Sequence, residues 1–184
     1  MADHVLLVGM MGAGKSTVAR LVAARLGRPH VDTDVEVERA AGSSVREIFS
    51  TRGEAGFRVE ESRVLAAVLG GSVPVVVSVG GGAVLDDTNR AALRGAGTVV
   101  WLRARPDTLA RRVGRNADRP LLAAAADATG PGGPAPALAR IEAQRRGLYE
   151  EVASVVIDVD DLAPAAVVER VLGAVGPSSR EHSR

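Results

Sequence analysis

The sequence contains no cysteine, which excludes disulfide bonds, Cys-ligated zinc and catalysis by a thiol. Aromatic residues make up only 2% of its 184 residues, which argues against a pocket that stacks on the base of a nucleoside acceptor. Its 23 basic and 22 acidic residues give a net charge of +1, so we expect no nucleic-acid partner. No apolar run is long enough to span a membrane, and the first residues lack the pattern of a signal peptide. We therefore expect a cytoplasmic protein without a membrane partner.

The remaining composition is that of a globular protein, with 46% hydrophobic and 24% charged residues. Short apolar runs alternate with helical patterns, which predicts an α/β fold with a parallel sheet and right-handed crossovers. The predicted strands cover residues 4–8, 29–34, 73–79, 98–102 and 155–159. The predicted helices cover residues 16–26, 35–41, 44–50, 54–69, 87–94, 106–113, 138–152 and 164–175.

Two segments interrupt this alternation. Residues 114–137 are rich in Gly, Pro and Ala, and we interpret them as a mobile lid, with a tolerated surface insertion as the alternative. Residues 177–184 are polar and are expected to form a disordered C-terminal tail. We therefore expect residues 1–176 to form a single domain that carries the lid.

The most specific motif is Gly9-Met-Met-Gly-Ala-Gly-Lys-Ser16, which follows a predicted strand and opens a predicted helix. This is the pattern of a P-loop, in which backbone N–H groups and the helix N-terminus hold phosphate oxygens. Lys15, the only lysine in the chain, is predicted to reach the β- and γ-phosphates. The Ser16 hydroxyl is predicted to bind Mg²⁺. The motif thus indicates binding of a nucleoside triphosphate, with ATP and Mg²⁺ as the expected cofactors.

A second group of candidate residues is the pair of carboxylates in Asp32-Thr-Asp34. At the end of a strand, the two side chains would point the same way, because side-chain direction has a period of two. Asp32 could then reach the metal through water while Asp34 faces a substrate. The alternative is a pair of solvated turn acids.

Several other residues predict a site for an anionic acceptor. Arg58 and Glu61 share one face of a helix, Gly80–Gly82 ends a central strand, Arg119 lies in the predicted lid and Arg145 lies on the helix that follows it. Arginines that converge on a small site indicate a carboxylate or phosphate ligand. The alternatives are a surface ion pair for Arg58 and Glu61 and a plain strand end for the glycines. With Asp34 as an acceptor for hydroxyls, we expect a small, polyhydroxylated, anionic substrate that ATP phosphorylates.

In order and spacing, these motifs resemble the shikimate kinase family of nucleoside-monophosphate-kinase-like P-loop proteins. The resemblance rests on Gly-x-x-Gly-x-Gly-Lys-Ser-Thr17, Asp32-Thr-Asp34, Phe57-Arg58-x-x-Glu61, Gly80-Gly-Gly82-Ala-Val, Arg119-Pro-Leu-Leu and the segment from Arg145 to Tyr149. It implies transfer of the γ-phosphoryl group of ATP to the 3-hydroxyl of shikimate, in the route to chorismate and the aromatic amino acids. It also implies a three-layer fold with a five-stranded parallel sheet in the order 2-3-1-4-5, and a monomer.

The resemblance also implies a role for individual residues. By resemblance, the residues expected to bind shikimate are Asp34, Arg58, Glu61, Gly80, Gly81, Gly82 and Arg145, with Phe49 and Phe57 as walls of the pocket. Its nucleotide-binding residues are Gly12, Ala13, Gly14, Lys15, Ser16, Thr17, Arg112 and Arg119. Its metal-binding residues are Ser16 and Asp32, and its catalytic residues are Lys15, Asp34 and Arg119. Leu162 replaces a basic residue that the family often has near the adenine, so an apolar or backbone contact is expected there.

Three other functions are compatible with the P-loop. A kinase for gluconate would also need an anionic polyol site, and a nucleoside monophosphate kinase would share the fold. A nucleotide-dependent switch would need no acceptor site. The shikimate kinase hypothesis makes the sharpest structural demand: Arg58 and Arg145, far apart in sequence, must line one cavity that faces the γ-phosphate.

Overall fold

The computed structural model describes residues 3–113 and 134–176. A five-stranded sheet forms its centre, in the order β2-β3-β1-β4-β5 and with every neighbouring pair parallel. The strands are β1 (His4–Val8), β2 (His30–Asp32), β3 (Val76–Ser78), β4 (Gly97–Arg103) and β5 (Val155–Asp158). The predicted fold class and strand order are therefore confirmed. The predicted tail at 177–184 lies outside the described residues, as do residues 114–133 of the predicted lid.

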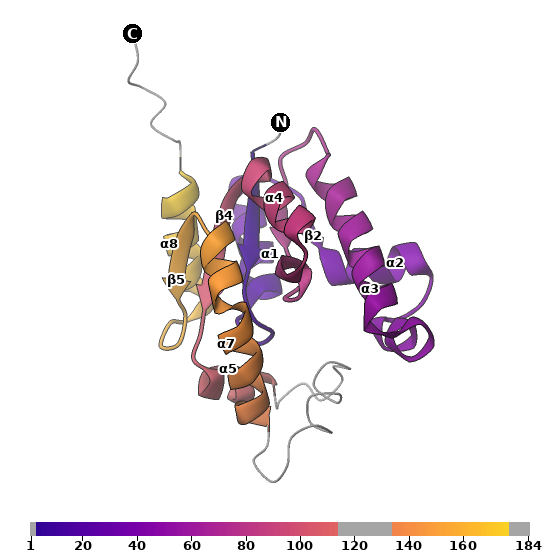
Figure 1. Cartoon of the computed structure of the whole chain (residues 1–184). Helices are drawn as coiled ribbons and strands as arrows, with labels where there is room; N and C mark the ends of the chain where they lie inside the picture. The colour runs from indigo at the N-terminus through magenta and orange to yellow at the C-terminus, as the bar shows by residue number, and fades with distance from the viewer. Residues whose placement is uncertain (1–2, 114–133, 177–184) are drawn as a thin grey trace.

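Helices cover both faces of the sheet (Figure 1). On one face, α1 (Lys15–Leu26) packs beside α8 (Pro164–Val175). On the other face lie α4 (Asp87–Ala96) and α7 (Pro134–Val152), and α5 (Pro106–Val113) packs against α7. A further pair, α2 (Thr33–Ala41) and α3 (Val45–Leu69), stands to one side of the sheet in Figure 1. None of the helices in the described ranges is long and apolar enough to cross a membrane.

The sheet is apolar because both of its faces are covered. Every residue of β1 is buried, and Leu6 pairs with Val77 of β3 on one side and with Val99 of β4 on the other. The predicted strand at 73–79 is shorter in the structure, because Pro74 has no amide hydrogen to donate to a neighbouring strand. All strands end at the same edge, where a parallel sheet of this kind binds its ligands.

Helix ends follow the sequence signals at most positions. The spacing Ser44-x-x-Glu47 predicts a capping box, and these two residues form one at the start of α3. Gly27 ends α1 with a φ of 63°. For the helix expected at 87–94, the sequence offers Asp87 as the N-cap, but this is wrong: the N-cap of α4 is Asp86, whose side chain accepts a hydrogen bond from the backbone N–H of Asn89.

Two helix boundaries also differ from the prediction. The two helices predicted at 44–50 and 54–69 form one run, α3, with a kink at Gly53, where φ is 68° and ψ is −177°. Helix α7 begins at Pro134, four residues before its predicted start, because proline is accommodated at the first position of a helix.

The α2–α3 pair has a small hydrophobic core of its own. Val37, Ile48, Phe57 and Val64 are buried together, and Phe49 packs against this cluster with its ring centroid 4.8 Å from that of Phe57. This cluster fixes α3 relative to α2, so that side chains on both helices can line one cavity. Phe49 and Phe57, both predicted to wall the substrate pocket, pack together here; Phe57 also lines the cavity described below, and the role of Phe49 stays a prediction.

Candidate active site

The P-loop joins β1 to α1 and depends on its glycines. Gly9, Gly12 and Gly14 have φ values of 138°, 81° and 94°, a region that side chains disfavour. A Cβ atom on Gly9 would lie 2.5 Å from the carbonyl oxygen of Leu102. The ammonium group of Lys15 donates to the carbonyl oxygens of Gly9 at 2.9 Å and Met10 at 3.1 Å. The loop therefore holds a positive charge beside its own N–H groups, an arrangement suited to phosphate.

Asp32 is the centre of a hydrogen-bonded group at the ends of β2 and β3. Its Oδ2 accepts from the Ser16 hydroxyl at 2.6 Å and from the Ser78 hydroxyl at 2.8 Å, and Nε2 of His30 lies 3.0 Å from Ser78 Oγ. Burial lowers the pKa of His30, against the opposing effect of the Asp32 carboxylate. A serine hydroxyl and a carboxylate on adjacent elements supply the hard oxygen ligands that Mg²⁺ prefers.

The explanation offered for Asp34 from the sequence was wrong, although the residue does reach the site. The strand ends at Asp32, and Asp34 lies in the first turn of α2. Its backbone N–H donates to Asp32 Oδ1 at 3.1 Å, so Asp32 caps the helix that carries Asp34. The two carboxylates are therefore brought together by a helix cap and not by strand periodicity.

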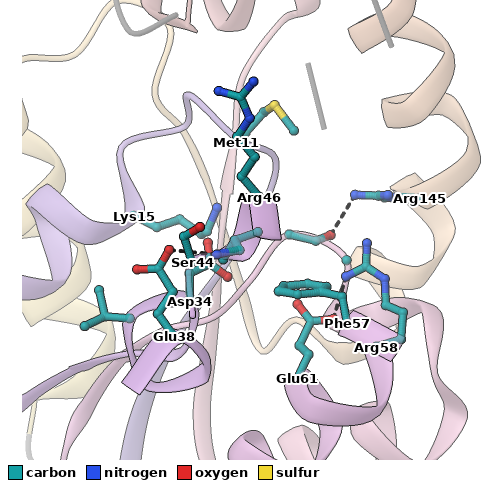
Figure 2. Close-up of a pocket in the computed structure, with 14 residues that line it drawn as sticks. Met11, Lys15, Asp34, Glu38, Ser44, Arg46, Phe57, Arg58, Glu61 and Arg145 are labelled. Carbon is teal, nitrogen blue, oxygen red and sulfur yellow. Dashed lines mark hydrogen bonds and ion pairs between the residues drawn. The ribbon is translucent and has the colours of Figure 1, made fainter. Parts of the chain in front are cut away.

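A cavity of about 300 Å³ lies between the α2–α3 pair, the P-loop and α7 (Figure 2). Arg58 and Arg145 both line it, together with Asp34, Glu61 and Lys15. Two guanidinium groups separated by 87 positions thus meet at one small site, as the sequence hypothesis required. Both signs of charge occur in the lining, because Glu61 is paired with Arg58 and Asp34 lines the cavity together with Lys15.

Arg58 is held by two carboxylates of its own helix. Its Nη1 lies 2.5 Å from Glu61 Oε2, and its Nη2 lies 3.0 Å from Glu54 Oε1. Glu61 is buried, so this pair is not a solvated surface pair. Burial raises the pKa of Glu61, and the Arg58 guanidinium opposes that rise. Burial alone would lower the pKa of Arg58, but Glu61 and Glu54 outweigh it, so the pKa is raised and the guanidinium stays charged.

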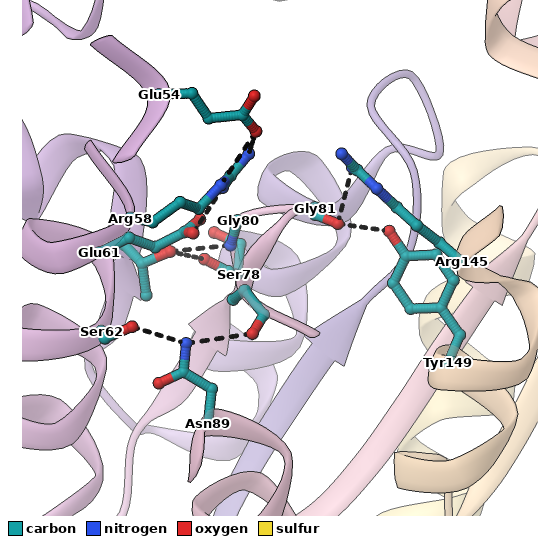
Figure 3. Close-up of polar contacts among 12 residues, drawn as sticks. Glu54, Arg58, Glu61, Ser62, Ser78, Gly80, Gly81, Asn89, Arg145 and Tyr149 are labelled. Carbon is teal, nitrogen blue, oxygen red and sulfur yellow. Dashed lines mark hydrogen bonds and ion pairs between the residues drawn. The ribbon is translucent and has the colours of Figure 1, made fainter. Parts of the chain in front are cut away.

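Gly80–Gly82 leave room for the side chains that build the site. A Cβ atom on Gly82 would overlap the Arg58 guanidinium, and one on Gly80 would collide with the Glu61 carboxylate. On the opposite side of the turn, the Gly81 carbonyl accepts from Arg145 Nη1 at 3.1 Å and from the Tyr149 hydroxyl at 2.7 Å (Figure 3). The glycines therefore allow Arg58, Glu61 and Arg145 to approach one turn of backbone.

A second cavity of about 390 Å³ adjoins the first on the P-loop side. Its lining contains Gly12, Gly14, Lys15, Ser16, Thr17, Asp32 and Arg112 of the predicted nucleotide and metal set. Lys15 and Asp34 line both cavities and so mark their boundary. A smaller pocket, of about 240 Å³, continues from Arg112 to Leu162, Pro164 and Val167, and offers the apolar surface expected near an adenine.

Sequence reasoning missed some of the lining residues. Met11, Val35, Glu38, Ser44, Val45 and Arg46 line the first cavity. Ser44 carried a signal, but only as a helix cap, and nothing in the sequence placed the start of α3 beside the P-loop. Arg119, predicted to assist phosphoryl transfer, lies outside the described residues.

Comparison with known proteins gives a consistent result. Residues 11–175 match the family model described as shikimate kinase. Shikimate kinases from Nitrobacter winogradskyi and Paramagnetospirillum magneticum are 44% and 45% identical to the chain, each over 91% of its length and over 74% and 82% of theirs. A solved structure of shikimate kinase from Acinetobacter baumannii, in complex with shikimate, has a TM-score of 0.86 and 34% identity, and the match covers 95% of this chain and 93% of that one.

Proposed function

The chain belongs to the shikimate kinase family, and from this premise we propose that the cavity lined by Arg58 and Arg145 binds shikimate while the P-loop cavity binds ATP. The enzyme transfers the γ-phosphoryl group of ATP to the 3-hydroxyl of shikimate and releases ADP and shikimate 3-phosphate. The family match sets aside the gluconate kinase, nucleotide kinase and switch hypotheses.

The observation that carries the assignment of sites is the boundary between the two cavities. Lys15, Asp34 and Val35 line both of them, so the two polar side chains at this boundary lie where a hydroxyl in one cavity would meet a phosphate in the other. In this position Asp34 can accept a hydrogen bond from the attacking hydroxyl and receive its proton. Lys15 can neutralise charge on the transferring phosphoryl group.

The charge of the acceptor cavity fits a monocarboxylate. Glu61 is buried against Arg58. The lining as a whole holds four cationic side chains (Lys15, Arg46, Arg58 and Arg145) and three carboxylates (Asp34, Glu38 and Glu61), which leaves a formal charge of +1. The remaining positive charge matches the single carboxylate of shikimate. We propose that Glu61 acts chiefly by orienting the Arg58 guanidinium.

Replacing either arginine should weaken binding of the acceptor more than it slows chemistry. For Arg58→Ala and Arg145→Ala we expect the KM for shikimate to rise about 10²-fold, with kcat changed by only a few-fold, because a charge-assisted pair to the carboxylate is lost in ground state and transition state alike. Steady-state kinetics with varied shikimate measure both parameters. Arg63→Ala, on the same helix but exposed and paired with Glu60, is the control and should have wild-type kinetics. A normal KM in both arginine variants would contradict the assignment.

The Gly82→Ala variant tests whether the glycine turn makes room for Arg58. The added methyl group would overlap the guanidinium, so we expect the KM for shikimate to rise by about tenfold or more. The φ of Gly82 is −96°, so backbone strain does not contribute. Gly95→Ala, where the methyl group would meet no atom within 4 Å, serves as the control in the same kinetic assay. Equal behaviour of the two variants would count against this explanation.

The donor set on the nucleotide side fits Mg²⁺. We propose that Ser16 and Asp32 hold the ion, because a hydroxyl and a carboxylate, with the phosphates of ATP, form the oxygen-rich site that Mg²⁺ usually takes. No group of three or more His, Cys, Asp or Glu side chains suited to a metal occurs within residues 3–113 and 134–176, and one or two protein ligands are typical of an ion bound with a nucleotide. When bound, Mg²⁺ would neutralise charge on the phosphates.

An acceptor panel in a coupled assay of ADP release tests the proposed function. Shikimate should support ATP-dependent turnover, whereas gluconate and AMP should not, and chelation of Mg²⁺ should abolish the reaction. Turnover with gluconate or AMP but not with shikimate would reject the proposal. That the enzyme acts as a monomer stays a prediction from the family resemblance, and that it works in the cytoplasm stays a prediction from the sequence composition.

A further inference from the structure

Tyr149, the only tyrosine of the chain, lies beneath the floor of the acceptor cavity. It is fully buried on α7, one turn after Arg145, and its ring stacks on Trp101 with the centroids 5.6 Å apart. It does not line either of the two main cavities. Its hydroxyl nevertheless donates to the carbonyl oxygen of Gly81 at 2.7 Å, directly below the glycine turn (Figure 3).

The Gly81 carbonyl is an acceptor that Tyr149 shares with Arg145. Arg145 Nη1 donates to the same oxygen at 3.1 Å, and the two lone pairs of a carbonyl oxygen accommodate both donors. The shared oxygen therefore sets the position of the Arg145 guanidinium relative to the turn. Because the peptide unit is planar, fixing this carbonyl also fixes the direction in which the N–H of Gly82 points.

The Tyr149 hydroxyl has few other hydrogen-bond acceptors within reach. Burial raises the pKa of Tyr149 to about 12, against the opposing effect of the Arg145 guanidinium, so the hydroxyl keeps its proton at neutral pH and acts as a donor. Besides the Arg145 guanidinium, the hydroxyl also has the sulfur of Met10 at 3.8 Å, which is a weak acceptor. A Cβ atom on Gly81 would lie 3.5 Å from the hydroxyl and 3.2 Å from the Gly9 carbonyl, so the turn is packed closely between Tyr149 and the P-loop.

We propose that Tyr149 is a positioning residue of the acceptor site, whose hydroxyl fixes the Gly81 carbonyl and thereby holds Arg145 in place for the acceptor carboxylate. The proposal rests on the assignment of Arg145 to that carboxylate. The short hydrogen bond of Tyr149 goes to the glycine turn, whereas its contact with Met10 of the P-loop is weak, so its loss should affect shikimate much more than ATP.

The Tyr149→Phe variant removes the hydroxyl and keeps the ring that stacks on Trp101. We expect both the Kd and the KM for shikimate to rise about fivefold to tenfold, because a change of this size corresponds to the loss of one hydrogen bond. Titration calorimetry measures the Kd. The KM for ATP and kcat should stay within about twofold of the wild type. In a variant that also carries Arg145→Ala, removal of the hydroxyl should have little further effect, because both groups act through the same carbonyl.

Val171→Ala is the matched control for a general loss of stability, since Val171 is fully buried on α8, away from the acceptor cavity. It should lower the thermal midpoint without changing the Kd for shikimate. A wild-type Kd in Tyr149→Phe, or an equal rise of the KM for ATP and shikimate, would overturn the proposal. If Arg145→Ala also binds shikimate normally, the acceptor assignment itself fails, which separates that failure from a failure of Tyr149 as a positioning residue.

Discussion

Replacing Asp34 with asparagine is expected to lower kcat for phosphorylation of shikimate by about 10²-fold to 10³-fold, with a much smaller change in the KM for either substrate. The amide keeps the shape of the side chain but loses the negative charge and the capacity to take a proton. Asp34 lies where the acceptor and nucleotide cavities meet, so this capacity is lost at the attacking hydroxyl. Initial rates with saturating ATP and varied shikimate separate kcat from KM.

The backbone contact of this residue is retained in the variant. The N–H of residue 34 donates to Asp32 whichever side chain it carries, so the start of α2 should fold normally. Glu36→Gln, in the same first turn of α2 and paired with Arg39, is the control and should retain full activity. A kcat within a few-fold of the wild type in Asp34→Asn would show that Asp34 does not take the proton, because the amide oxygen can still accept a hydrogen bond from the hydroxyl but cannot act as a base.

The second large effect is expected for Lys15→Met, which should lower kcat by about 10³-fold or more and raise the KM for ATP. Methionine has a similar length but no charge, so the phosphoryl group would lose a cation that is positioned before the reaction begins. The effect should be largest in the transition state, where negative charge is distributed over the transferring group. Single-turnover measurements would show that the chemical step is slowed, and nucleotide titration would report the loss of affinity.

Lys15 also bridges the carbonyl groups of Gly9 and Met10, so the variant must be tested for folding. Arg25→Met, at the end of the same helix, removes an exposed cation paired with Glu169 and provides the control for a change of charge. A Lys15→Met enzyme that is folded, binds ATP and turns over at a near-normal rate would contradict the role given to the ammonium group.

Local sequence signals predicted the parts of the structure that local physics determines. The P-loop glycines, the capping box of α3 and the buried strand β1 each depend on a few neighbouring residues, and each was predicted at its place. The family resemblance supplied the order of the strands, which alternation alone does not give. The pairing of Arg58 with Glu61 followed from helical spacing, because residues three apart share a face.

The features of the site that depend on packing between distant segments could not be predicted from local sequence patterns. Burial of Glu61 depends on how α3 meets the glycine turn, and the shared use of the Gly81 carbonyl depends on where α7 crosses the sheet. The position of Asp34 was predicted for the wrong reason, since the capping preference of Asp32 ends the strand early and begins a helix.

The most direct test of the central claim compares shikimate with its methyl ester, which keeps the ring and the hydroxyls but has no negative charge. In the wild-type enzyme we expect kcat/KM for shikimate to exceed that for the ester by about 10³-fold, and in the variant that combines Arg58→Ala with Arg145→Ala we expect the two values to become nearly equal. Loss of discrimination in the double variant would show that the two guanidinium groups together recognise the carboxylate. Discrimination that stays at the wild-type level in the double variant would show that the carboxylate binds elsewhere.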